Sequence, residues 1–263
     1  MKKLLFFIAL STFIFSANAQ IKIGGKSLNT KKLVGAASDL ATAITLSDED
    51  VANLCKESVE WMDTHNKVSD DDSPYTQRLN KLTENLKEVN GIKLNFKVYE
   101  VIDINAFACG DGSIRVFSSL MDIMDDDELL AIIGHEIGHI AGTDTKDAIK
   151  RAYLASAAAK AAGSAGGAME KLSESQLGEI AQSFVSAKFS QKQEYAADEY
   201  GFKVCIENGR SPYGMANALN KLVELSNGEK ASVIQQMFSS HPDSEKRAAK
   251  MKEKADKYTA ENK

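Results

Sequence analysis

Two histidines and a glutamate stand close together in the sequence with a spacing that suits metal chemistry. The segment His135-Glu-Ile-Gly-His139 places the histidines four residues apart, and helix residues with that spacing project from one face. Glu136 follows the first histidine by about 100° of helix rotation. It can therefore reach a water molecule beside a metal rather than the metal itself. This is the HExxH pattern of zinc peptidases, in which two imidazoles bind Zn²⁺ and the glutamate takes a proton from water.

The residues around this motif favour a helix. At average residue usage, a chance match to these three positions is expected in well under about one in a hundred such chains. The acidic residues 125–128 complement the positive start of a helix. Gly134 and Gly138 leave a bare strip on which another helix can pack closely. An apolar stripe along the same segment is formed by Leu129, Ile133, Ile137 and Ile140. We therefore predict one helix that carries His135, Glu136 and His139 as a metal site.

The choice of a third metal ligand is limited by the small number of histidines. The longer HExxHxxGxxH pattern nearly fits, because Gly142 is in place, but its last position is Thr145. Only His65 and His241 remain elsewhere in the chain. A carboxylate from a later helix is the usual alternative in sites with two histidines and a glutamate.

The best carboxylate candidate is Glu194, in the segment Glu194-Tyr-Ala-Ala-Asp198. Asp198 lies one helical turn later and can accept a hydrogen bond from the outer N–H of a ligand histidine. Taken alone, this segment would be interpreted as a solvated helix face. With the HExxH motif upstream, we predict that Glu194 is the third ligand and that Asp198 orients a histidine.

The rest of the chain predicts helices around one group of strands. Helices are expected from Ser47 toward Thr64 and from Ser73-Pro74 onward. Lys93 to Ile102 alternates as a strand does, and short extended runs flank the turn residues 110–112, which suggests a hairpin. Everything after Leu120 is helix-like again, with Ala155 to Ala168 expected to be a helix end that passes into a mobile loop. The predicted fold class is α+β, mostly helical, with a small sheet beside the active-site helix.

The order of these motifs resembles the gluzincin peptidase family that includes the CAAX prenyl proteases, the HtpX-like proteases and the exported LoiP-like peptidases. The matching stretches are Asn105-Ala-Phe-Ala108, Ile114 to Asp122, the His135 motif, Glu194 to Asp198, and His241-Pro242 with Arg247. The resemblance covers roughly residues 94–251. It is greatest to the LoiP-like branch, because the membrane helices of HtpX-like members are missing. It implies one zincin-type metallopeptidase domain over residues 20–263.

The resemblance also implies roles for residues outside the metal motif. Asn105, Ala106, Phe107 and Ala108 would form an edge strand whose backbone pairs with an extended substrate. The alternative for this strand is an ordinary core hairpin. His241 would lie near the metal and stabilise the oxyanion, with Arg247 as structural or electrostatic support. The alternative for His241 is a His-Pro turn that caps the last helix.

The start of the chain predicts export. Two lysines precede a short apolar run, and Ala17-Asn18-Ala19 supplies a cleavage pattern, so residues 1–19 are predicted to be a signal peptide. The run is too short to span a membrane, and no cysteine near the cleavage site could carry a lipid. We expect a periplasmic or secreted protein without an integral membrane segment in the mature chain, and leave membrane association and oligomeric state open.

The charge of the chain argues against one class of binding partner, and its cysteine content limits the possible disulfides. Removing Lys2 and Lys3 leaves 30 basic against 37 acidic residues, a net charge near −7, with no basic cluster that would suit nucleic acid. The odd number of cysteines, Cys55, Cys109 and Cys205, allows one disulfide and one free thiol, or three buried reduced thiols.

Together these features predict a zinc-dependent metalloendopeptidase with one Zn²⁺ per chain and polypeptide substrates, which acts on extracytoplasmic proteins, chiefly misfolded proteins of the cell envelope. Two alternatives stay open from the sequence. One is a non-catalytic zinc-binding chaperone or binding module, against which the intact Glu136 argues. The other is a secreted protease that acts on host proteins, which only the natural substrate would distinguish.

Overall fold

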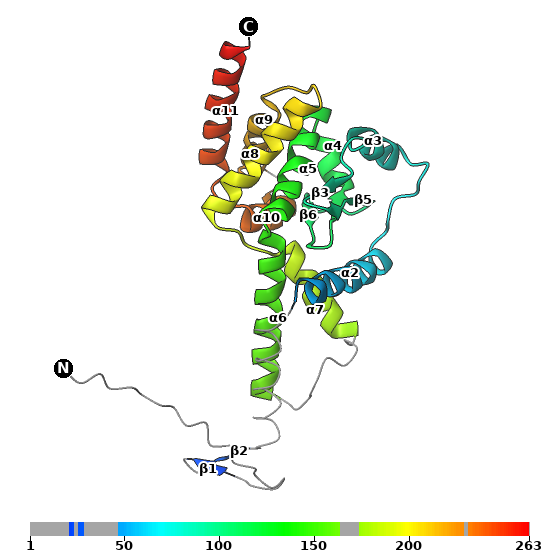
Figure 1. The fold of residues 1–263 in the computed structure, drawn as a ribbon, viewed down its shortest axis with the longest axis vertical. Helices are drawn as coiled ribbons and strands as arrows, with labels where there is room; N and C mark the ends of the chain where they lie inside the picture. Colours follow the sequence, from blue (N-terminus) through cyan, green and yellow to red (C-terminus); the bar gives the residue numbers. More distant parts are fainter. Residues whose placement is uncertain (1–20, 24–25, 29–46, 164–173, 229–230, 263) are drawn as a thin grey trace, which may run out of the picture.

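The computed structural model of the protein describes residues 21–23, 26–28, 47–163, 174–228 and 231–262 (Figure 1). The predicted signal peptide, residues 1–19, lies outside the described residues. The helices are α2 (Asp48–His65), α3 (Pro74–Leu82), α4 (Ser118–Ile123), α5 (Asp126–Ala141), α6 (Asp144–Gly163), α7 (Glu174–Val185), α8 (Gln191–Glu207), α9 (Gly214–Ser226), α10 (Ala231–Ser240) and α11 (Ser244–Glu261). The strands are β1 (Ile21–Ile23), β2 (Lys26–Leu28), β3 (Glu88–Val89), β4 (Ile92–Lys93), β5 (Asn95–Tyr99), β6 (Ala106–Ala108) and β7 (Ser113–Phe117).

A three-stranded sheet in the order β5-β7-β6 lies beside α5. β5 pairs with β7 in parallel, whereas β6 and β7 form the antiparallel hairpin predicted between residues 105 and 118. Gly112 turns this hairpin with a φ of +95°, and a Cβ atom there would lie 2.1 Å from the carbonyl oxygen of Lys93. β6 is consequently an edge strand of the sheet. The predicted α+β fold class, mostly helical with a small sheet beside the motif helix, is confirmed.

The prediction that strands are confined to one group is wrong. β1 and β2 pair as an antiparallel hairpin far upstream of the main sheet. The physical signal was present in the sequence, because Ile21 and Ile23 alternate with Lys22 before two glycines. β3 and β4 form a further small hairpin that adjoins the predicted group.

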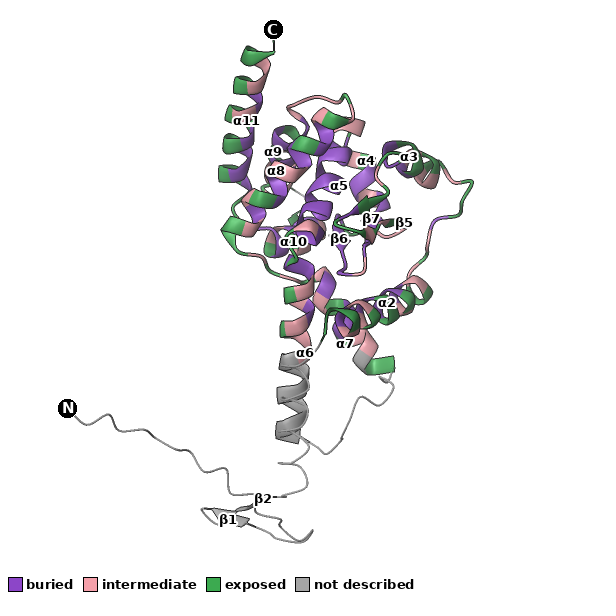
Figure 2. Cartoon of the chain, viewed as in Figure 1, coloured by how far each residue is buried: buried purple, intermediate pink, exposed green. Residues whose placement is uncertain are grey.

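The motif helix α5 is buried along almost its whole length (Figure 2). Asp125 and Glu128 form a capping box at its start, which satisfies free N–H groups of the first turn. α8 packs directly on the predicted bare strip: Cβ atoms at Gly134 and Gly138 would lie 2.8 Å from the Cα atoms of Gly201 and Ala197. The predicted close approach of a second helix is confirmed, and it places α8 against the face beside the two histidines.

The two faces of the sheet contact different sets of helices. Ala106, Ala108 and Val116 belong to a core shared with α5. Phe107 and Phe117 belong to a second core shared with α2 and α7. The buried Arg115 of β7 joins the sheet to α2, because its guanidinium donates two hydrogen bonds to Asp63 of α2, at 2.8 and 3.0 Å.

Asp63 also accepts from Lys97 and Tyr99, at 2.8 and 2.6 Å. Burial opposes ionisation of Asp63, but its hydrogen bond from Arg115 and those from Lys97 and Tyr99 prevail and hold its pKa below the usual value. The charged carboxylate therefore fixes the end of α2 against the three-stranded sheet.

Several sequence predictions concern other parts of the chain. All three cysteines are free thiols with buried side chains, and burial raises the pKa of Cys55 to about 12. α6 continues as a helix to Gly163, and the rest of the segment 155–168 lies outside the described residues. Among the helices that the structure describes, none combines the length and apolar character required to cross a bilayer.

Candidate metal centre

Four buried side chains from three parts of the fold bring their donor atoms together. His135 and His139 lie on α5, Glu194 lies in the first turn of α8, and His241 follows α10. One ligand atom from each lies within 4.8 Å of those of the others. His135 Nε2 and His139 Nε2 are 3.1 Å apart, and the Glu194 oxygens lie 3.7 and 3.5 Å from them. This set of two histidines, one carboxylate and one further histidine can bind a metal ion.

The outer nitrogens of both α5 histidines face carboxylates. His135 Nδ1 lies 2.9 Å from Asp198 Oδ1, the contact expected from the sequence. His139 Nδ1 lies 2.9 Å from Asp144 Oδ2, and Asp144 accepts a further bond of 2.6 Å from Gln193. Asp144 was not among the residues predicted from the sequence. Its signal was a carboxylate that follows the end of the motif helix by a few residues. Both arrangements fix the ring orientation, so that each Nε2 points at the shared centre.

Arg247 on α11 holds two of these carboxylates in place. Its guanidinium lies 2.5 Å from a Glu194 oxygen and 2.6 and 2.8 Å from the two oxygens of Asp198. Burial alone would raise the pKa of Glu194 and Asp198. The neighbouring histidines prevail at Glu194, and Arg247 and His135 prevail at Asp198, so both pKa values lie below their ordinary range. Glu194 therefore presents a charged carboxylate to the centre.

The two α5 histidines have different surroundings. At His135 burial prevails and lowers the pKa. At His139 burial acts in the same direction, but the carboxylates of Asp144 and Glu194 prevail and raise the pKa to about 9. The negative charge at the centre therefore favours a cation there, whether a proton on His139 or a metal ion.

Glu136 is 2% exposed, and its Oε1 atom has no hydrogen-bond partner among the residues described. The same oxygen lies 3.7 Å from His241 Nε2. A buried carboxylate oxygen without a partner is costly, so this position requires a reason. Its place beside the four donor atoms suits a group that receives a proton from water or substrate.

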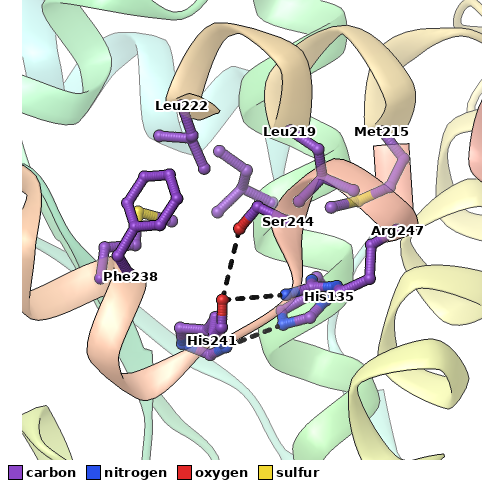
Figure 3. A pocket seen from close by; sticks show the side chains of 10 residues that line it. His135, Met215, Leu219, Leu222, Phe238, His241, Ser244 and Arg247 are labelled. Atoms are coloured by element: carbon purple, nitrogen blue, oxygen red, sulfur yellow. Dashed lines mark hydrogen bonds between the residues drawn. The ribbon is translucent and has the colours of Figure 1, made fainter. Parts of the chain in front are cut away.

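His241 faces the centre with one ring nitrogen and Glu136 with the other. Its Nδ1 atom lies 3.2 Å from both His135 Nε2 and Glu194 Oε1. The His135 and His241 rings meet edge to face, with centroids 5.1 Å apart, and both line a small pocket (Figure 3). The apolar part of that pocket is lined by Ile132, Met215, Leu219, Leu222, Met237 and Phe238.

The predicted substrate strand Asn105 to Ala108 coincides with β6 and its preceding residue, and it contacts α5. Asn105 is 1% exposed; its Oδ1 accepts the N–H of Ala106 at 3.0 Å, while its Nδ2 has no partner within the described ranges.

His65 is not brought to the centre and instead stacks on Trp61 at 3.8 Å. Phe189, which no sequence motif indicated, stacks on the His139 ring at 3.9 Å.

Comparison with known proteins identifies the class of this centre. The model of the family described as Peptidase family M48 matches residues 75–255, more than half of the chain. The chain belongs to peptidase family M48. It is 37% identical to Metalloprotease LoiP of Escherichia coli (strain K12) over 237 residues, which covers 90% of this chain and 92% of that relative. Metalloprotease YcaL of the same strain is 35% identical over 228 residues, covering 86% and 88%.

More distant relatives are similar over less of the chain. A Protease HtpX homolog of Tropheryma whipplei (strain Twist) is 28% identical over 230 residues, covering 73% of this chain and 76% of that relative. Membership in family M48 confirms the resemblance inferred from the sequence motifs. The protein is therefore a metallopeptidase, an enzyme that hydrolyses peptide bonds in polypeptide substrates.

Proposed function

We propose that this member of family M48 is a zinc-dependent endopeptidase that is exported and cleaves extracytoplasmic proteins, chiefly misfolded proteins of the cell envelope. The observation that carries the catalytic part is the buried, unpartnered oxygen of Glu136 beside four convergent donor side chains. Export rests on the sequence of residues 1–19, which has the charged start, apolar run and small-residue cleavage pattern of a signal peptide.

The donor set fits one Zn²⁺ ion per chain. His135, His139 and Glu194 offer two imidazole nitrogens and a carboxylate oxygen, a common catalytic zinc set that keeps a further position for water or substrate. All three side chains are buried, and their contacts to Asp144, Asp198 and Arg247 hold them in place. When bound, zinc would polarise the scissile carbonyl and lower the pKa of the attacking water.

The remaining steps belong to side chains of this protein. Glu136 takes a proton from the water as the water oxygen bonds to the carbonyl carbon. It then delivers that proton to the amine nitrogen as the C–N bond breaks. His241, whose Nε2 atom lies 3.7 Å from Glu136, donates to the oxygen that gains negative charge in the tetrahedral state. Arg247 keeps Glu194 and Asp198 charged and aligned.

The substrate is proposed to bind as an added strand on β6. Phe117 N–H donates to Asn105 O at 3.0 Å, so the backbone groups of Asn105 face β7. The backbone N–H and C=O groups of successive residues in a strand point alternately to its two sides. Those of Ala106 and Ala108 therefore point away from β7, toward the outer edge of the sheet. Ala106 and Ala108 are 1% and 6% exposed, so this edge must open before an extended peptide can pair with it. The unpartnered Nδ2 of Asn105 can then donate to a peptide carbonyl.

Zinc removal tests this function. The purified mature protein is expected to contain about one zinc ion, to cleave unfolded casein, to lose cleavage with a zinc chelator, and to regain it when Zn²⁺ is restored. Elemental analysis and gel-based cleavage measure these results. Undiminished cleavage by zinc-free protein would contradict the proposed mechanism.

Replacing Asp144 with alanine should weaken zinc binding by about 10- to 100-fold, the usual effect of removing an outer partner of a ligand histidine. The His139 ring would lose the acceptor that lies 2.9 Å from its Nδ1 atom. Competition with a chelating dye measures the Kd. Asp147→Ala is the matched control, because it removes the same charge from an exposed position on the same helix. Equal zinc affinity in the two variants would exclude an orienting role for Asp144.

A further inference from the structure

A large cavity lies on the face of the three-stranded sheet that is turned away from α5. Its volume is about 610 Å³, which falls within the range of ligand-binding pockets. The walls come from the end of α2, from the sheet, and from α7 and α10. We call it the outer-face cavity, and define it by Trp61, Tyr99, Phe107, Phe117, Gln236 and Ser239. It shares no lining residue with the small pocket beside His135 and His241.

Strand β6 connects this cavity to the proposed substrate edge. Ala106 and Ala108 pack on the side of α5, whereas Phe107, between them, points to the opposite face and lines the cavity. In an antiparallel pair, side chains of directly opposed residues lie on the same face of the sheet. A peptide residue opposite Phe107 would therefore direct its side chain toward the outer-face cavity, while its two neighbours would face α5.

The wall formed by α2 and the sheet is aromatic. Phe107, Phe117 and Tyr99 lie with ring centroids 6.1 to 6.3 Å apart, and Phe107 meets Phe117 edge to face at 88°. Trp61 adds a fourth ring, held by a hydrogen bond of 2.7 Å from its Nε1 atom to Glu174. Tyr99, Phe107 and Phe117 are themselves buried, so the favourable free energy comes from the apolar or aromatic side chain that leaves water to contact them.

The opposite wall is a polar stripe of α10. Ser232, Gln235, Gln236 and Ser239 lie on one face of this helix and all line the cavity. Gln236 Nε2 donates to Val185 O at 2.9 Å, and Ser239 Oγ donates to Gln236 O at 2.9 Å.

We propose that the outer-face cavity is a specificity site that receives one large apolar or aromatic side chain of the polypeptide paired with β6, at the position opposite Phe107. This inference rests on the proposed peptidase function and adds a determinant on the far side of the sheet from the metal centre. Selection of this substrate side chain acts in addition to the contacts that the enzyme makes with substrate residues beside the scissile bond.

The test uses peptides that are identical except for one phenylalanine, which replaces alanine at each position around the cleavage site in turn. The wild-type enzyme is expected to prefer phenylalanine by about 10-fold or more in kcat/KM at one position away from the scissile bond, the discrimination that an apolar pocket provides. Two variants, Ser232→Trp and Ser239→Trp, each place a large ring into the cavity from an exposed position of α10. Both should lose this preference, with kcat/KM for the phenylalanine peptide falling more than kcat/KM for the alanine peptide.

Ala231→Trp is the matched control, because Ala231 is exposed on the same helix and does not line the cavity. It should keep the preference. The cavity assignment is overturned if both filled variants keep the full preference, if they lose cleavage of the alanine and phenylalanine peptides equally, or if the wild type prefers phenylalanine at no such position. Failure of the peptidase function itself looks different, since no peptide would then be cleaved by the zinc-loaded wild type.

Discussion

Replacing Glu136 with glutamine is expected to reduce peptide-bond hydrolysis by about 10²- to 10⁴-fold, the usual contribution of a positioned general base. Glutamine keeps the size of the side chain but cannot accept a proton from water at neutral pH. The structure leaves Glu136 Oε1 without a hydrogen-bond partner among the described residues, so the substitution breaks no bond that the fold needs. Zinc content should stay near that of the wild type, because Glu136 is not among the four grouped donors.

The measurement compares kcat/KM on an unfolded protein substrate with zinc content by elemental analysis. Glu207→Gln is the control, because it makes the same chemical change at an exposed position on α8. It should leave both quantities unchanged. Undiminished cleavage by Glu136→Gln would remove this residue from the reaction. Loss of zinc together with activity would place Glu136 among the ligands.

Replacing Glu194 with alanine is expected to abolish stable zinc binding and, with it, hydrolysis. Glu194 supplies the only carboxylate of the donor group, and its charge offsets the positive charge that zinc brings into a buried site. The change also removes the carboxylate 2.5 Å from Arg247. A buried charge that loses its partner destabilises a fold by about 3–5 kcal/mol, although Arg247 here retains Asp198.

For that reason Glu194→Gln accompanies the alanine variant. Glutamine keeps the side-chain volume and can still accept a hydrogen bond from Arg247, yet it lacks the charge that zinc requires. Both variants should show lower zinc stoichiometry, while only the alanine variant should show a large fall in thermal stability. Glu199→Ala, on the same helix and outside the donor group, is the control. Wild-type zinc stoichiometry in both Glu194 variants would exclude this residue from the site.

Local sequence was sufficient to predict those site residues whose relative positions are fixed by one helix. The spacing of His135 and His139 determines that both project from one face of α5, whatever surrounds that helix. The bare strip of Gly134 and Gly138 also predicted a close helix neighbour, and α8 occupies it. This contact explains how a carboxylate about sixty residues later in the chain can reach the histidines.

Sequence was insufficient where a contact depends on how separate elements pack. Asp144 follows its own histidine partner by only five residues, yet its position depends on the turn between α5 and α6, including Thr143 with a φ of +63°. A short loop can direct a carboxylate toward or away from a helix, and the residue types do not decide which. The β1–β2 hairpin was missed for a different reason, since its alternation spans only three residues on each side.

The sequence by itself determined the chemical class: a helix that presents two imidazoles and a carboxylate in fixed phase, together with a later acidic motif. Those features are set by residue type and by the period of a single helix. Only the tertiary structure decided where His241 lies, between Glu136 and the donor group, and how Arg247 joins Glu194 to Asp198. It alone placed a large cavity behind the edge strand. The reason is that such contacts depend on the packing of distant helices and strands, which a linear pattern of residue types does not specify.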